Sequence, residues 1–171
     1  IPHNVPAFRC HRYATCNESS RLMVEAGMQI ASNICTNLEQ IPPFFDRLGL
    51  LQVPIYFEDG GYLWQGHSLI QIPKPQKDTL TVVNIHPMHF VLNTPTFEYM
   101  VKVKRQFTRE SWRGMNQKTL ASLKHQGKGI RSLIISLIEG FDEVTPLVAS
   151  MAKSPQFSTK IGESNIFKAR Q

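Results

Sequence analysis

The pattern of apolar positions predicts a buried strand near the middle of the chain. Residues 80–85 form a short apolar run rich in β-branched side chains, which indicates a strand buried on both faces. The run stops at His86-Pro87, because proline has no N–H to continue a ladder of backbone hydrogen bonds. His86 and His89 therefore follow the carboxyl end of a strand, where α/β folds bind ligands.

The first third of the chain predicts a helix followed by a strand. Asn17 is a suitable N-cap for a helix over residues 17–26, and Gly27 is a natural C-terminal stop. Residues 28–33 predict a strand directly afterwards. This alternation is typical of a mostly parallel sheet.

The next segment predicts a strand that leads into two acidic residues. Residues 36–50 contain adjacent prolines and two phenylalanines, which indicate a packed loop or a broken helix. Residues 51–57 predict a second strand. It runs into Glu58 and Asp59, and the two glycines that follow predict a tightly bent loop.

The second half of the chain predicts more helix. Residues 97–128 are basic and indicate an elongated insertion with some helix, whereas residues 130–138 carry apolar side chains at the spacing of an amphipathic helix. Residues 142–154 predict a further helix or turn, and residues 157–161 a last short strand.

Size and composition favour one globular domain of 171 residues, 42% hydrophobic and 19% charged. No stretch approaches the roughly 20 apolar residues of a membrane span. The net charge of +6 is local, because residues 102–131 hold nine Lys or Arg and one acid. This stripe is either a solvated helical face or a surface for an anionic polymer. No nucleic-acid motif accompanies it, so we do not expect nucleic acid as a partner.

The cysteines and the first residues bear on cellular compartment. Cys10, Cys16 and Cys35 are odd in number and lack C-x-x-C spacing, which favours reduced and mostly buried thiols. The chain starts at Ile1 with no basic, signal-like region, and we expect a cytoplasmic protein.

Two histidines and two acids are the main candidates for chemistry. The His86 imidazole can transfer a proton near neutral pH, and the alternative is a histidine that only ends the strand. His89 either shares a metal or a substrate with it or packs in the loop. Glu58 and Asp59 can act as a base, as metal ligands or as acceptors for sugar hydroxyls; the alternative is simple solvation.

Other candidates point to a carbohydrate or a carboxylate. Trp64 can stack on a sugar ring, as can Tyr62, although packing at the rim or in the core competes with this role. Arg9 and Arg12 can orient a carboxylate or bind substrate oxygens, or they are surface arginines.

Several of these stretches, taken in order, resemble a known family. The order of motifs is similar to that of the second half of a polysaccharide deacetylase (NodB-homology) domain. The resemblance rests on Phe8-Arg9-Cys10-His11-Arg12-Tyr13, Glu25-Ala26-Gly27, Val53-Pro54-Ile55-Tyr56-Phe57-Glu58-Asp59, Val82-Val83-Asn84-Ile85-His86-Pro87 and Gly129-Ile130-Arg131.

This resemblance implies an α/β fold of the distorted or partial β/α-barrel type and removal of N-acetyl groups from a sugar or polysaccharide with a divalent metal, usually zinc. Arg9 resembles the residue that orients the catalytic base. Asp59, with Glu58, resembles the acidic motif at the groove wall. Ile85 resembles the lining of the acetyl pocket, and His86 the general acid. The implied partner is a carbohydrate substrate, and Trp64 and His89 would join its binding site.

The chain also departs from the family pattern. His11 stands where the arginine motif usually has a proline, and the Asp-Asp and H-x-x-x-H motifs that supply the base and the metal ligands are absent. Either the chain is the carboxyl-terminal part of a longer protein, or it lacks the usual metal site; the absence of an initiator Met favours the first. Alone, the chain is expected to be inactive or weakly active. The alternative function is a non-catalytic carbohydrate-binding or scaffold protein with a degenerate barrel.

Overall fold

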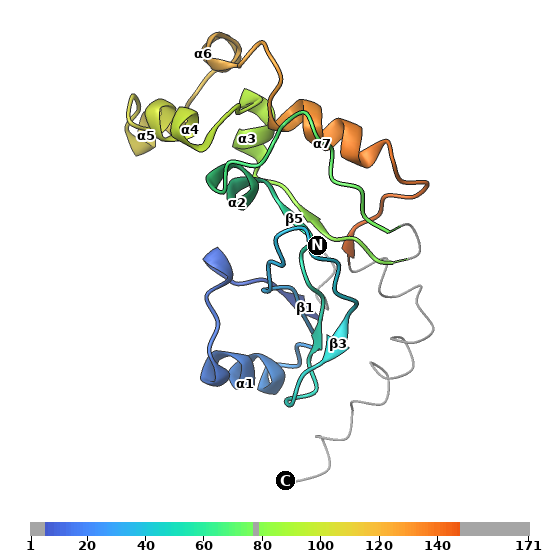
Figure 1. The fold of residues 1–171 in the computed structure, drawn as a ribbon. Helices are drawn as coiled ribbons and strands as arrows, with labels where there is room; N and C mark the ends of the chain where they lie inside the picture. Colours follow the sequence, from blue (N-terminus) through green and yellow to red (C-terminus); the bar gives the residue numbers. More distant parts are fainter. Residues whose placement is uncertain (1–5, 77–78, 148–171) are drawn as a thin grey trace. The chain divides into compact units, whose positions relative to one another are not determined.

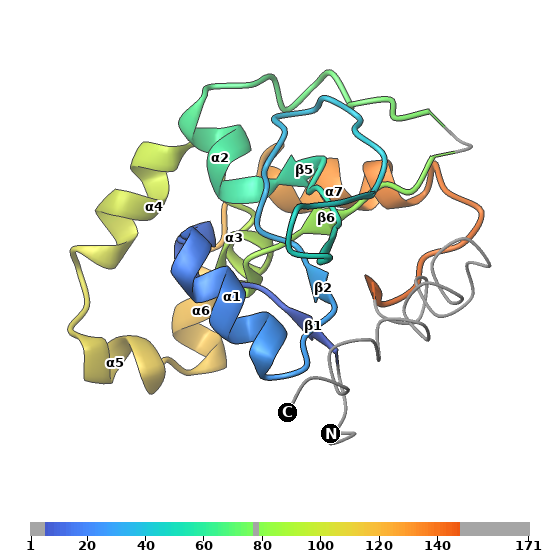
Figure 2. The same cartoon turned by 90° about the horizontal axis from the view of Figure 1, so that it is seen from below.

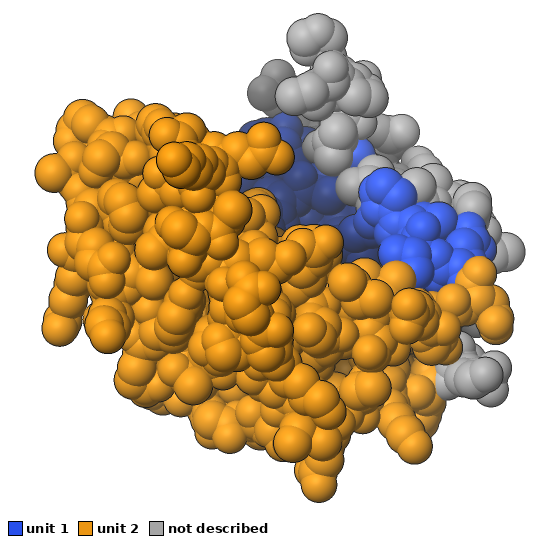
Figure 3. Space-filling view, turned by 90° about the horizontal axis from the view of Figure 1, so that it is seen from above, with its two compact units in different colours: residues 1–36, 41–55, 143–171 blue, residues 37–40, 56–142 orange. Residues whose placement is uncertain are grey.

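The computed structural model describes residues 6–76 and 79–147. The chain divides into two compact units, shown in different colours in Figure 3. Unit 1 comprises residues 1–36, 41–55 and 143–171, and unit 2 comprises residues 37–40 and 56–142. The sequence-based expectation of a single domain stays a prediction. Within the described part of the chain, every helix is too short or too polar to cross a bilayer.

Unit 1 is built on a four-stranded sheet of very short strands (Figure 1). The order is β1-β2-β4-β3, with β1, β2 and β4 parallel and β3 antiparallel at one edge. This arrangement confirms the mostly parallel sheet expected from the sequence. The strands are β1 (Ala7–Phe8), β2 (Ile30–Ala31), β3 (Phe44–Phe45) and β4 (Leu51–Gln52).

The predicted first helix is present, but its N-cap is the residue before the one expected from the sequence. The one-turn 3₁₀ helix η1 (His11–Tyr13) precedes α1 (Asn17–Glu25). The N-cap is Cys16 rather than Asn17, and its Sγ accepts a hydrogen bond from the backbone N–H of Ser19 at 3.5 Å. The expectation of mostly buried thiols is wrong for Cys16 and Cys35, which are exposed.

Residues 36–57 differ most from the sequence-based prediction. The stretch expected as a loop or broken helix contains β3, which pairs with β4. The single strand predicted over residues 51–57 is two strands, β4 in unit 1 and β5 (Phe57–Glu58) in unit 2. Between them, Pro54 has no N–H to donate, and Ile55 forms only an isolated bridge to Cys35.

Unit 2 has a two-stranded parallel sheet covered by helices (Figure 2). Strand β5 pairs with β6 (Val83–Asn84) in the register Phe57↔Val83 and Glu58↔Asn84. The sequence predicted the position of this strand correctly. The prediction that both of its faces are buried is wrong, because Val83 and Asn84 are only half-buried. With β5 as its one partner among the described strands, β6 is left with a second edge open.

The helix predicted over residues 130–138 is α7 (Ile130–Ile138). Its buried positions follow the predicted spacing and pack against Phe57 and Tyr62 in the core of unit 2. Helices α2 (Asp59–Trp64) and α3 (Pro87–Leu92) each follow one strand of the small sheet. The buried residues of α7 are Ile130, Leu133, Ile134 and Leu137.

The basic segment is more helical than expected. It contains α4 (Phe97–Lys104), α5 (Arg109–Arg113) and α6 (Gln117–Leu123). Met100 and Val103 of α4 form a second small core with Leu92 of α3. The strand predicted over residues 157–161 lies outside the described residues, as does most of the helix or turn predicted over residues 142–154.

The described residues therefore form a mixed α/β structure, as expected. Their strands make one four-stranded and one two-stranded sheet, and within these ranges no closed barrel is formed.

Candidate functional site

The site of unit 2 begins where β5 passes directly into α2. Glu58 ends the strand and is the N-cap of the helix, and its carboxylate accepts hydrogen bonds from the backbone N–H groups of Gly60, at 3.1 Å, and Gly61. A Cβ at position 60 or 61 would lie 3.0 or 2.9 Å from a Glu58 oxygen, so glycine makes room for the cap. The tight loop expected after Asp59 is therefore wrong, because this capped turn starts a helix.

Strand pairing brings His86 to Asp59, although 27 residues separate them in sequence. Glu58 and Asn84 are opposite each other in the parallel pair. Asp59 follows the first strand by one residue and His86 follows the second by two. Pro87 occupies the first turn of α3, which leaves His86 as the N-cap residue at the strand end.

The Asp59 carboxylate binds His86 with both oxygens. Oδ2 accepts the backbone N–H of His86 at 2.8 Å, and Oδ1 lies 2.6 Å from Nδ1 of the ring. Oε1 of Glu58 is 3.0 Å from the same Nδ1. Asp59 is fully buried, whereas 55% of the His86 side chain is exposed. The carboxylates thus hold the imidazole at Nδ1, and the rest of the ring faces solvent. Nε2 can therefore contact a substrate or another ligand.

These contacts set the charges of the site. Hydrogen bonds to Asp59 and then Glu58 raise the pKa of His86 to about 10, so the ring is a cation at neutral pH. Burial alone would raise the pKa of Glu58. Hydrogen bonds from His86 and from the Gly61 and Gly60 N–H groups outweigh burial and leave that pKa below its ordinary value.

His89 lies in α3 rather than in the loop that the sequence suggested. Its side chain is buried, and its ring meets that of His86 edge-on with 5.7 Å between centroids. Burial is the main cause that lowers the pKa of His89, so the ring is neutral at neutral pH. Nδ1 of this ring is buried and has no hydrogen-bond partner among the described residues.

Asp59, His86 and His89 together form a group that can hold a metal ion. One ligand atom from each lies within 4.8 Å of the other two. Two imidazoles and a carboxylate are ligands that suit zinc, and the orphaned Nδ1 of His89 fits such a role. A cation bound by all three would occupy a ring nitrogen of His86. Metal binding and proton donation by His86 therefore exclude each other.

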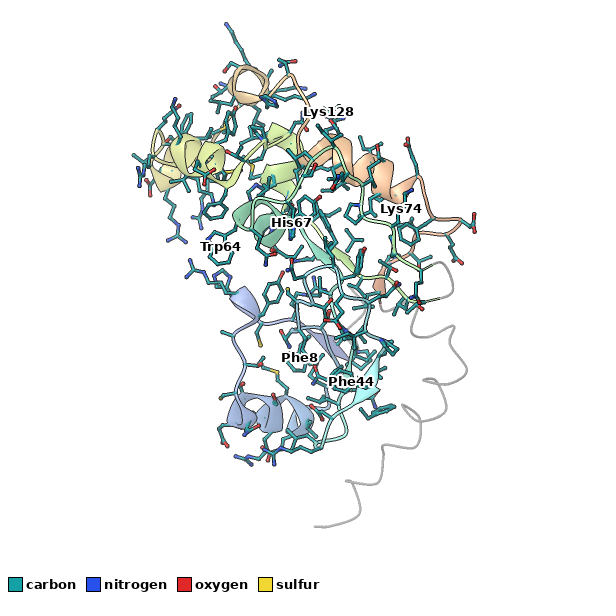
Figure 4. All side chains as sticks on the ribbon, viewed as in Figure 1. Phe8, Phe44, Trp64, His67, Lys74 and Lys128 are labelled. Atoms are coloured by element: carbon teal, nitrogen blue, oxygen red, sulfur yellow. The ribbon has the colours of Figure 1, made fainter. Side chains whose placement is uncertain are left out.

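The other predicted site residues have varied surroundings. Trp64, labelled in Figure 4, is 70% exposed at the end of α2, which leaves its ring free for stacking. Tyr62 is buried, and its hydroxyl donates to the Ser68 carbonyl, so it belongs to the core. Ile85 is half-buried and packs on the core of unit 2.

The two arginines belong to unit 1. Nε of Arg9 donates to the Ser32 carbonyl at 3.0 Å, and an amino group donates to the Ser32 hydroxyl at 2.9 Å. Arg12 is exposed and adopts a positive φ of 54° within η1. The role of Arg9 as an orienting residue stays a prediction.

The sequence did not indicate that Glu58 both caps α2 and contacts His86. The signal was present, because an acid followed by glycines at the second and third helical positions permits a side-chain cap. It was hidden by the poor helix propensity of glycine.

One solved structure with a similar fold covers most of this chain. It is a Bordetella bronchiseptica protein provisionally described as a polysaccharide deacetylase involved in O-antigen biosynthesis, and it aligns with a TM-score of 0.68 at 21% sequence identity. The alignment covers 81% of this chain and 56% of that one, so this chain spans little more than half of its structural relative. No protein-family model matches the chain, and no curated protein sequence does. The likeness establishes a shared fold.

Proposed function

We propose that this chain is part of a hydrolase that removes N-acetyl groups from a sugar or polysaccharide, with His86 as the proton donor. The observation that carries the proposal is the exposed imidazole of His86, whose Nδ1 is bound by a buried carboxylate. The similar fold of a protein described as a polysaccharide deacetylase supports it, as does the order of sequence motifs.

Amide hydrolysis requires a proton for the nitrogen that leaves. Asp59 and Glu58 keep the ring protonated at neutral pH and fix Nδ1, so the proton delivered to the substrate is the one on Nε2. A pKa of about 10 makes the ring a weak acid that is almost wholly in its donor form at pH 7. Such a donor fits an amine, which is a basic leaving group.

We also propose substrate contacts around this donor. Trp64 would stack on a sugar ring, since its indole is exposed at the end of α2, the helix that begins at Asp59. Ile85 would line the pocket for the acetyl methyl group. Glu58 and Asp59 would contact the substrate only through the ring that they hold.

A divalent metal, with zinc as the best candidate, would polarise the acetyl carbonyl and activate the attacking water. Asp59, His86 and His89 are the described residues that would hold such an ion, but only if His86 gives up its proton. The proposal assigns the proton to His86, and other ligands of the whole protein would then bind the catalytic metal.

The test measures turnover of an N-acetylated oligosaccharide by the full-length protein, with the amount of free amine released as the readout. His86→Ala should lower turnover about a hundredfold or more, on the scale of general acid catalysis. His67→Ala is the control, because His67 is a half-buried histidine of the same unit whose Nε2 contacts Asn37 and Gln65 rather than Asp59 or Glu58. Unchanged turnover in His86→Ala would refute the assigned role.

Asp59→Asn gives a second readout that loss of structure would not produce. Without the carboxylate, the pKa of His86 should fall toward its ordinary range. The alkaline limb of the pH–activity profile should then move to lower pH in this variant. An unshifted limb would show that another group is the donor.

The exposed Trp64 also favours a second candidate, a non-catalytic carbohydrate-binding protein. In that case Trp64→Ala would abolish oligosaccharide binding, whereas the full-length protein would release no amine at any pH.

A further inference from the structure

The excess positive charge of the chain is concentrated in one part of unit 2. Residues 102–131 contain nine Lys or Arg and one acid, while all remaining residues together contain ten basic and twelve acidic residues. The net charge of +6 therefore arises entirely from this segment, which includes the last three residues of α4 and all of α5 and α6.

These basic side chains are not neutralised by the protein. The salt bridges among the described residues lie on α1 and at the His86 site, and none involves a Lys or Arg of residues 102–131. Seven of the nine are exposed; Lys124 and Arg131 are half-buried, and the guanidinium of Arg131 lies over the Phe90 ring at 5.3 Å. Most of the segment is thus free to bind an anion.

A groove of about 590 Å³ runs along α4, where this segment begins. Its lining combines two cations with an acid, an aromatic ring and smaller groups: Phe97, Glu98, Val101, Lys102, Arg105 and Gln106. Lys102 and Arg105 are three residues apart in or at the end of one helix, so they project on the same side.

The mixture of groups decides which anion fits. Lys102 and Arg105 can bind carboxylates, and the Arg105 guanidinium can do so with two parallel hydrogen bonds. The Phe97 ring offers an apolar surface for the C–H face of a sugar. The Glu98 carboxylate can accept hydrogen bonds from the free hydroxyls of a sugar.

The groove is connected to the candidate site through α2. Helix α4 packs against α2, the helix that starts at Asp59, and Figure 2 shows the two side by side. A strand that occupied the groove would lie close to the site residues of the same unit.

We propose that the α4 groove binds an acidic polysaccharide, a strand whose sugars carry carboxylates and free hydroxyls. This inference rests on the proposed function and names its substrate class: the strand in the groove is the polymer that the site deacetylates.

The test measures binding of an oligogalacturonate to the protein at 50 and 200 mM salt, with dextran of similar length as the neutral control. Binding should weaken as salt rises, and dextran should not bind. K102E/R105E should weaken binding at low salt about tenfold or more and lower the slope of log Kd against log salt by about one per contact removed. K102Q/R105Q, which only removes the charges, should show a smaller loss in the same direction.

Lys74→Glu is the matched control for charge. Lys74 is an exposed lysine of the same unit, and Figure 4 shows it on the side of unit 2 away from α4 and α5. It should leave binding nearly unchanged. Lys74→Glu reverses one charge where K102E/R105E reverses two. Weakening by Lys74→Glu of half the size or more, on a logarithmic scale, would overturn the proposal, because attraction would then depend on net charge alone.

Two further outcomes would overturn it. One is failure of the oligogalacturonate to bind at low salt. The other is equal or tighter binding of single-stranded DNA with the same dependence on Lys102 and Arg105, which would make the groove a nucleic-acid surface. His86→Ala should bind the oligogalacturonate as tightly as the unmodified protein. Failure of the groove proposal would therefore appear in the binding measurement, and failure of the proposed role of His86 in the turnover measurement.

Discussion

The buried Asp59 carboxylate stabilises the cationic form of His86. A buried carboxylate without a partner is costly, and the imidazolium of His86 provides the compensating cation together with two hydrogen bonds. The same ring is more than half exposed, so the pair joins the interior of unit 2 to its surface. One side chain therefore has a structural and a proposed chemical role.

The raised pKa of His86 predicts how stability depends on pH. Because the pKa in the folded state, about 10, is above the ordinary value of 6.5, the ring's contribution to stability is complete below about pH 6.5 and is lost as pH rises through 10. The thermal midpoint of the unmodified protein should approach that of His86→Gln between pH 7 and pH 10. Equal differences at pH 6 and pH 10 would contradict this linkage.

The same pKa predicts weak and pH-dependent zinc binding by Asp59, His86 and His89. A cation must displace the proton of His86, which lowers the apparent affinity about a thousandfold at pH 7 relative to a ring already deprotonated. Titration calorimetry from pH 6.5 to 8 should show affinity rising about tenfold per pH unit, with His86→Ala as the control. Affinity that is constant over this range would mean that the ring carries no such proton.

The sequence predicted the candidate residues better than their contacts. His86 was found because an apolar run ended at a proline, which is a local signal. Its bonds to Asp59 and Glu58 depend on the register of two strands 26 residues apart, and nothing local encodes that register. The burial of His89 likewise follows from packing of α3, not from its neighbours in sequence.

Among the helices and strands, α3 and α7 are joined by one asparagine. Asn93 ends α3 with a left-handed backbone (φ 48°), and its Nδ2 donates to the carbonyls of His125, at 3.0 Å, and Gly127, at 2.8 Å. Its Oδ1 accepts the N–H of Ser132 in the first turn of α7 at 3.4 Å. The helix that starts at the candidate site is thereby fixed to the helix that provides half of the buried residues in the main core cluster of unit 2.

This junction leaves no space for a side chain at Gly129. A Cβ there would lie 2.1 Å from the backbone oxygen of Asn93, which cannot move without disrupting the end of α3. Gly129→Ala should lower the free energy of unfolding by about 3 kcal/mol, at the upper end of overpacking effects. Gly114→Ala is the control, since its Cβ would meet the Glu110 carbonyl at an ordinary 3.5 Å. Urea denaturation of both variants is the measurement, and equal stability would show that the junction yields.

Elements with a strong local pattern were predicted well. The apolar spacing of α7 is visible in sequence, and so is the stop of α1 at Gly27, whose φ is +84°. Helix α2 was missed because its second and third positions are glycines, which disfavour helix until the Glu58 carboxylate binds their N–H groups. In that case a side-chain contact outweighed local propensity.

Across the whole molecule, burial is uneven. Helix α7 buries four large side chains, whereas α1, α5 and α6 bury none. Because local opening requires less free energy where fewer apolar contacts are lost, native-state hydrogen exchange should be slowest in α7. Amides of α5 should exchange faster by about two orders of magnitude or more, and similar protection in both helices would contradict this expectation.

The division into two units was not predictable from the sequence. One of its boundaries, between Ile55 and Tyr56, falls within the run of residues 51–57 that the hydrophobic pattern presents as one strand, and only Pro54 marks a break there. The expected barrel was inferred from a family resemblance. The described residues and a structural relative that is covered over 56% of its length confirm a related α/β fold and no more.

The double contact between Asp59 and His86 has a consequence for how these positions can vary. Substitution of His86 leaves the buried Asp59 carboxylate without a cation, and substitution of Asp59 leaves the His86 ring without its main hydrogen-bond partner. Single changes should therefore be deleterious even where a double change is tolerated. The two positions should then change together, and a lineage that lost His86 should soon lose the buried Asp59 as well.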